Sequence, residues 1–230
     1  PFFRQMFPQA TVAASAIAAK TLGAEKAIGF FCQMDEALTG WLLRAGAIQE
    51  LHRPEPLVEK RIAVDRLLKE GDVLAVEGAA FQVLETPGHS DCSLSFYEPN
   101  RKILILSDAT GYYMPGEKAW WPNYFTDYRV YVDSMRRLAS LNAEIACLSH
   151  NAAIRGADDV RAYFQDAIAA TEAYHQRILT ETRAGKPARQ IGEELGVEIH
   201  AKTPVLPVEF FQKNCGLMVK LSLKSAGIAN

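Results

Sequence analysis

Residues 81–90 read FQVLETPGHS, a largely apolar run that ends in a Pro-Gly turn followed by a histidine. The run is short and contains aromatic and β-branched side chains, which is typical of a buried β-strand, and Pro-Gly marks its end. Three further β runs lie close to it, at 73–76, 93–97 and 102–106, and Gly and Pro turns separate them. This spacing predicts adjacent strands of one sheet.

Helical patterns lie on both sides of these strands. The apolar residues predict a short helix over 2–7, a small strand at 10–13, and two or three helices with a loop between 15 and 69. An amphipathic helix is expected over 130–141, followed by a buried strand at 145–148. Alternating helices and strands of this kind indicate an α/β fold.

The end of the chain has a different character. Apolar residues there recur every three or four positions, which predicts a long helix, then a short helix over 188–195 closed by Gly196, and a last helix after it. We therefore expect two domains, an α/β domain over 1–156 and a helical subdomain over 157–230.

Composition limits the classes of partner. The 25 Lys and Arg residues nearly balance the 27 Asp and Glu residues, and no basic cluster indicates binding to nucleic acid or to a membrane surface. The four cysteines are far apart and form no C-x-x-C pair, which favours a reduced, cytoplasmic setting over a disulfide framework. We expect a small-molecule substrate.

Three polar residues each follow a predicted strand into a loop: His89, Asp108 and His150. Any one of them has a purely structural interpretation, as a turn residue, a cap or a core histidine. Together they indicate a metal hydrolase, because imidazole and carboxylate groups bind zinc, iron or manganese and an aspartate can bridge two ions.

An aromatic segment begins four residues after Asp108. Its candidate substrate-binding residues are Tyr112, Tyr113, Trp120, Trp121, Tyr124 and Phe125. One interpretation is a hydrophobic plug over the sheet, and the other is the wall of a substrate pocket. In the second case, this segment and the C-terminal helices should enclose an apolar acyl-binding pocket above the metals.

The motifs as a set resemble those of a known family. Thr86-Pro87-Gly88-His89-Ser90, then Ser107-Asp108, then Ser149-His150 look like the later metal-ligand motifs of the metallo-β-lactamase superfamily. The opening residues 1–8 and 12–15 resemble the segment that comes after the family's first motif, H-x-H-x-D-H, which this sequence lacks. The helical tail resembles the thioesterase-like branch that includes the aminobenzoylacetyl-CoA thioesterase of quinolone signalling.

The resemblance implies an αββα sandwich whose first layer is partly missing here, so that the chain looks incomplete at its N-terminus. It further implies two divalent transition-metal ions (Zn, Fe or Mn), with His89 on the first, His150 on the second and Asp108 as the bridging, catalytic carboxylate. A metal-bridging hydroxide would then hydrolyse an ester-type bond, thioester first and lactone or phosphoester next. The alternative is a non-catalytic ligand-binding or regulatory protein with a degenerate metal site. A homodimer stays open.

The sequence gives little support for a functional role of the remaining histidines or of Cys92. His52, His175 and His200 are isolated in the sequence and are expected to be structural or solvated. Cys92 follows a turn but has no evident orienting partner, so a catalytic role is not expected. Ser107 and Asn151 stand where the family usually has glycine.

Overall fold

The computed structural model describes residues 2–56 and 58–228, and the chain divides into two compact units, Pro1–Leu68 and Lys69–Asn230. The first unit is mainly helical. Its elements are α1 (Phe2–Met6), β1 (Ala13–Ser15), α2 (Ala16–Leu22), α3 (Glu25–Arg44), the 3₁₀ helix η1 (Glu50–His52) and β2 (Arg66–Leu68). Strands β1 and β2 pair in parallel, and Arg4 joins the two ends of the unit through an ion pair with Asp65.

The second unit is built on a sheet of six strands in the order β10-β9-β6-β5-β4-β3. These strands are β3 (Val73–Val76), β4 (Ala79–Glu85), β5 (Leu94–Glu98), β6 (Ile103–Ile105), β9 (Ile145–Cys147) and β10 (Ala153–Arg155). The other elements are η2 (Asp108–Thr110), the hairpin β7 (Tyr112–Met114) and β8 (Ala119–Trp121), and the helices α4 (Tyr128–Ala139), α5 (Ala157–Arg183), α6 (Ala188–Lys202) and α7 (Val208–Ser225).

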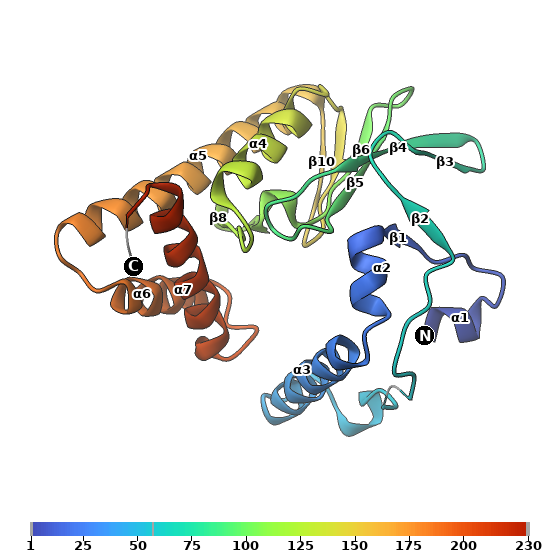
Figure 1. Ribbon diagram of the computed structural model, residues 1–230, viewed down its shortest axis with the longest axis horizontal. Helices are drawn as coiled ribbons and strands as arrows, with labels where there is room; N and C mark the ends of the chain where they lie inside the picture. Colours follow the sequence, from blue (N-terminus) through green and yellow to red (C-terminus); the bar gives the residue numbers. More distant parts are fainter. Residues whose placement is uncertain (1, 57, 229–230) are drawn as a thin grey trace. The chain divides into compact units, whose positions relative to one another are not determined.

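The core of the second unit lies between one face of this sheet and the helices. Leu84, Leu104 and Ala146 share that face in the strand register, and all three belong to a buried cluster with residues of α4 and α5. The same cluster continues into residues of α6 and α7. Figure 1 shows these two helices at the C-terminal end of α5. The C-terminal helices and the sheet therefore share one core, and the proposed division at residue 156 stays a prediction.

The structure confirms the predicted α/β fold and its helical C-terminal region. The strands expected at 73–76, 81–85, 93–97, 102–106 and 145–148 are present to within two residues. The small strand expected at 10–13 lies instead at 13–15, where the register with β2 decides its position. Among the described residues, no helix is long and apolar enough to cross a bilayer.

Gly196 does not end a helix as predicted. Helix α6 continues to Lys202, because the glycine gives space for α7 rather than a left-handed turn. A Cβ atom at Gly196 would lie 2.4 Å from Gln212 Cα, and one at Gly192 would lie 2.8 Å from Gly216 Cα. The two helices thus contact each other backbone to backbone.

This close contact gives a stability prediction. Gly196→Ala should lower the free energy of unfolding by about 1–3 kcal/mol because α6 and α7 must separate. Gly216→Ala is the matched control, since no atom lies within 4 Å of its added Cβ and alanine is the better helix former. Urea unfolding followed by circular dichroism measures both variants, and equal midpoints would contradict the packing argument.

His175 is structural, as expected, and gives a pH prediction. It is 7% exposed and its ring stacks on Tyr128 at 3.8 Å, and burial, with a smaller contribution from Arg129, lowers its pKa below 6.5. The unfolded chain therefore takes up this proton at a higher pH than the folded chain, so stability should fall as the pH drops below about 6.5. In His175→Gln, thermal melts between pH 7 and 5 should lose this part of the slope.

Candidate active site

Strand direction brings the three predicted ligands together. Strands β4 and β6 each run antiparallel to β5, and β9 runs parallel to β6, so β4, β6 and β9 share one direction. Their carboxyl ends therefore meet at one edge of the sheet. His89, Asp108 and His150 follow these three ends, which is why residues 61 positions apart at the extremes converge.

Three hydroxyl groups join the strand ends beneath the site. Thr86 Oγ1 lies 3.0 Å from Ser95 Oγ and 3.1 Å from Ser107 Oγ, and Ser95 Oγ also accepts the Ser107 backbone N–H at 3.3 Å. Thr86 precedes His89 by three residues and Ser107 directly precedes Asp108. The serine at 107, where the family usually has glycine, thus contributes a hydrogen bond that fixes the start of the Asp108 turn.

The loop after β8 holds the His89 turn in place. Gly88 O accepts the backbone N–H groups of Phe125 and Thr126, both at 3.0 Å, and the Thr126 hydroxyl at 3.1 Å. His89 Nδ1 donates to the carbonyl oxygen of Asn123 at 2.8 Å. Because a carbonyl oxygen can only accept, this bond leaves Nε2 of neutral His89 as the nitrogen with a free lone pair.

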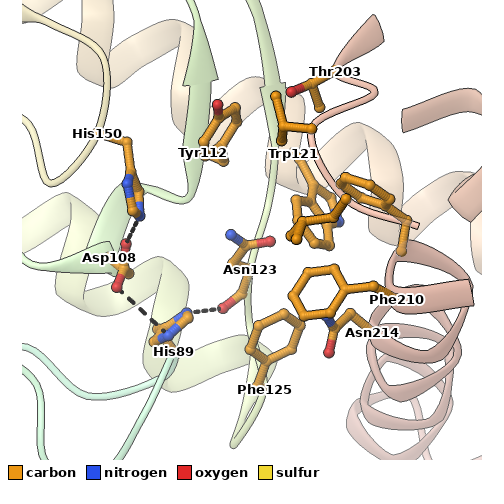
Figure 2. A pocket seen from close by; sticks show the side chains of 13 residues that line it. His89, Asp108, Tyr112, Trp121, Asn123, Phe125, His150, Thr203, Phe210 and Asn214 are labelled. Atoms are coloured by element: carbon orange, nitrogen blue, oxygen red, sulfur yellow. Dashed lines mark hydrogen bonds and ion pairs between the residues drawn. The ribbon is translucent and has the colours of Figure 1, made fainter. Parts of the chain in front are cut away.

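Both histidines direct Nε2 at the Asp108 carboxylate (Figure 2). His89 Nε2 lies 3.7 Å from Asp108 Oδ2, and His150 Nε2 lies 2.9 Å from Asp108 Oδ1. Despite the short distance, Asp108 Oδ1 is buried and makes no hydrogen bond. A buried carboxylate oxygen without a hydrogen bond is costly, and a metal ion bound at this point would offset that cost.

The donor atoms are chemically suited to a transition metal, since they are two imidazole nitrogens and one carboxylate. The carbonyl of Asn123 orients His89 in the way that outer partners of metal-binding histidines commonly do. In the described part of the chain, however, no group of three or more His, Cys, Asp or Glu side chains forms a metal site by itself. His89, Asp108 and His150 therefore fit as part of a ligand set.

Asn151 is the other position at which the family usually has glycine, and its backbone conformation explains why asparagine is tolerated there. Its backbone has a φ of +66°, in the left-handed region where asparagine is tolerated better than most residues. Its side-chain Nδ2 donates to Tyr113 O at 2.9 Å, which ties the His150 loop to strand β7. Asparagine therefore serves here in place of glycine.

A cavity of about 230 Å³ opens onto the three candidate ligands. The aromatic segment contributes Tyr112, Trp121 and Phe125 to its wall, and the α6–α7 region contributes Val205, Leu206, Phe210 and Phe211. The other polar residues of the lining are Asn123, Thr203 and Asn214. The structure thus brings the aromatic segment and the C-terminal helices together around one apolar pocket beside His89, Asp108 and His150.

The six predicted substrate-binding aromatics separate into two groups. Tyr112, Trp121 and Phe125 line the cavity, with Tyr112 against His150 and Phe125 against His89 at ring distances of 5.3 and 5.1 Å. The other three do not line it. Tyr113 and Trp120 pack around Tyr163, and Tyr124 is fully buried with its hydroxyl 2.8 Å from Ser222 Oγ.

Tyr113 and Trp120 pair on the face of the hairpin opposite to Tyr112 and Trp121, because alternate side chains of a strand point to opposite faces. Tyr124 follows the hairpin and is buried on its own account, so these three aromatics fit the plug interpretation. Sequence reasoning missed Asn123 and the pocket residues of α7. Asn123 is the one carboxamide between Tyr112 and Tyr128, and that isolation was the available signal.

The pocket carries little positive charge. None of the described residues that line it is a lysine or an arginine. Burial raises the pKa of Tyr131 well above 10, so this phenol, which interacts electrostatically with Asp108, stays neutral. The site therefore offers an apolar cavity, two imidazoles and one carboxylate.

Comparison with known proteins agrees with this geometry. The sequence profile of the metallo-beta-lactamase superfamily matches residues 9–150. An uncharacterized protein from Aquifex aeolicus is 38% identical over 74 residues, which cover 32% of this chain and 30% of that protein.

Two solved structures share the fold. A metallo-beta-lactamase family protein from Thermus thermophilus superposes with a TM-score of 0.58 and 23% identity, over 98% of this chain and 69% of that one. An archaeal superfamily protein from Sulfolobus tokodaii gives 0.53 and 18%, over 72% and 60%. With a profile match over more than half of its length, the chain belongs to the metallo-beta-lactamase superfamily.

Proposed function

We propose that this protein is a metal-dependent hydrolase of an ester-type bond, with an acyl thioester as the favoured substrate. The observation that carries the proposal is the convergence of His89, Asp108 and His150 at the mouth of an apolar cavity. Membership in the superfamily supports it, since most of its members are hydrolytic metalloenzymes.

His89, Asp108 and His150 would contribute ligands to the metal centre, for which we propose two ions of Zn, Fe or Mn. Such ions, when bound, polarise a carbonyl and generate a nucleophile from water. The residues of the chain position the reactants. The Asn123 carbonyl holds the His89 ring, and the aromatic wall of Tyr112, Trp121 and Phe125 orients the acyl group and excludes water. In the overall reaction, water supplies the oxygen of the new carboxylate, the acyl–sulfur bond breaks, and the products are a carboxylate, a thiol and a proton.

A substrate panel tests the proposal. The full chain is reconstituted separately with Zn²⁺, Fe²⁺ and Mn²⁺, its metal content is measured, and turnover is followed on an acyl thioester, a lactone and a phosphodiester. We expect metal-dependent turnover that is highest on the thioester and is lost with a chelator. Binding of the acyl compound without turnover under any metal would favour the ligand-binding alternative instead.

A further inference from the structure

Asp108 is the first residue of a short buried turn. The 3₁₀ helix η2 contains only Asp108, Ala109 and Thr110, and the last two are 0% and 2% exposed. The Gly111 backbone N–H donates to Asp108 O at 3.1 Å and closes the turn. A single 3₁₀ turn has poor hydrogen-bond geometry of its own. The position of the Asp108 carboxylate therefore depends on the residues that pack around this turn.

A tyrosine of α5 makes a hydrogen bond to the turn. Tyr163 is 5% exposed, and its hydroxyl donates to Thr110 Oγ1 at 2.9 Å. The two residues are 53 positions apart in the chain, so this bond joins the turn to a long helix of the core. Tyr113 and Trp120 pack around the same phenol ring. The ring is thus fixed by its neighbours, and its hydroxyl fixes Thr110, two residues after Asp108.

A second tyrosine packs against the other end of the turn. Tyr131 of α4 is fully buried, and its hydroxyl lies 3.0 Å from the position of a Cβ atom added at Gly111. The Cα atom of Tyr131 lies 2.3 Å from a Cβ added at Gly88, the residue before His89. This side chain therefore fills the space between the two ligand turns, but its hydroxyl makes no hydrogen bond to a described residue. Of these two phenols, Tyr163 is the one that holds the turn by a directional bond.

We propose that Tyr163 is a positioning residue for the candidate metal centre, an inference that rests on the proposed function. Through Thr110, its hydroxyl fixes the turn from which the Asp108 carboxylate meets both histidines. Groups that hold a metal ligand from behind contribute to metal affinity although they do not touch the ion. Tyr163 does not line the cavity, so it acts on metal binding and on the turnover number, and substrate binding does not depend on it.

The decisive variant is Tyr163→Phe, which removes the hydroxyl and keeps the ring. Tyr97→Phe is the matched control, because Tyr97 is also buried and its hydroxyl donates to Leu141 O at 3.2 Å, beyond the end of α4. Each variant loses one hydrogen bond of a buried phenol, so both melting temperatures should fall by similar amounts. A merely structural role of Tyr163 predicts no further difference between the two.

Amide hydrogen exchange of the metal-free protein, followed by NMR, is the first measurement. The Gly111 N–H, which closes the Asp108 turn, should exchange at least about tenfold faster in Tyr163→Phe than in Tyr97→Phe, because the turn opens locally. Thr110→Val removes the accepting hydroxyl and should give the same increase, and the double variant with Tyr163→Phe should be no faster than either single variant. Equal Gly111 exchange in Tyr163→Phe and Tyr97→Phe would overturn the inference.

Zinc affinity, from competition with a chromophoric chelator, is the second measurement. Tyr163→Phe should bind Zn²⁺ about 10–100-fold more weakly than wild type, as is typical for loss of a group that holds a metal ligand. On an acyl thioester, kcat should fall by a similar factor while KM stays unchanged, because the cavity wall is intact. Tyr97→Phe should match wild type in all three quantities. Wild-type zinc affinity in Tyr163→Phe would overturn the inference and leave the hydrolase proposal intact.

The exchange measurement separates this inference from the proposed function, because it needs neither metal nor substrate. If the wild-type protein hydrolyses no ester while Tyr163→Phe and Thr110→Val both accelerate exchange at Gly111, the proposed function fails. The assignment of Tyr163 as the residue that holds the Asp108 turn then stands.

Discussion

Replacing Asp108 with alanine is expected to lower kcat/KM for an acyl thioester by about 10³-fold, which corresponds to roughly 4 kcal/mol in the activation free energy. The reason is geometric. Asp108 lies between His89 Nε2 and His150 Nε2, so it is the group common to both halves of the candidate metal centre. Its loss removes the carboxylate charge that the cation needs.

The accompanying measurement is the metal content of the purified variant, which should fall together with turnover. Asp108→Asn keeps the shape of the side chain and removes only the charge, so it should resemble the alanine variant in activity. Asp133→Ala is the matched control on the exposed surface of α4, where the side chain is 72% exposed. An Asp108→Ala protein with wild-type kcat and metal content would show that this carboxylate is not part of the centre.

The second large effect concerns Gly88, which precedes His89. Its φ of +122° is rarely adopted by residues with a side chain, and an added Cβ would lie 2.3 Å from Tyr131 Cα and 2.5 Å from Tyr131 N. Helix α4 must therefore move if the position is occupied. Gly88→Ala should lower the free energy of unfolding by about 3 kcal/mol or more, through overlap and backbone strain together.

The same substitution should also disturb activity, because Gly88 O holds the loop of residues 123–126 that orients His89. Gly71→Ala is the control that separates backbone strain from steric overlap with α4. Gly71 also has a positive φ, of +81°, but no atom lies within 4 Å of its added Cβ, so only strain of about 1–2 kcal/mol applies. Denaturant unfolding of the two variants should differ clearly, and equal losses would show that the approach of α4 is unimportant.

The local sequence pattern predicted much of the fold. The strands of the sheet are short apolar runs that turn residues separate, and each remained where its own pattern placed it. The prediction of element boundaries failed where contact with a distant segment determines the boundary. The β1 strand lies at 13–15 because it pairs with 66–68, and Gly196 stays helical because Gln212 packs against it. Neither partner is visible from the local pattern.

The candidate ligands were identified for the same local reason, since His89, Asp108 and His150 each follow a strand of their own. The wall of the pocket was harder to predict. Density of aromatic residues did not distinguish Trp121, which lines the cavity, from Trp120, which packs against Tyr163. That difference depends on the orientation of the β7–β8 hairpin against α5, a long-range contact.

The sequence by itself thus determined the α/β class, the order of the strands along the chain and the residue types of the candidate metal centre, because turns, hydrophobic periodicity and ligand chemistry act over a few residues. Only the tertiary structure decided that Asn123 orients His89, that α7 lines the pocket and that half of the predicted substrate-binding aromatics lie in the core. These features join residues tens of positions apart, and their contacts arise from packing of whole elements, which no local pattern encodes.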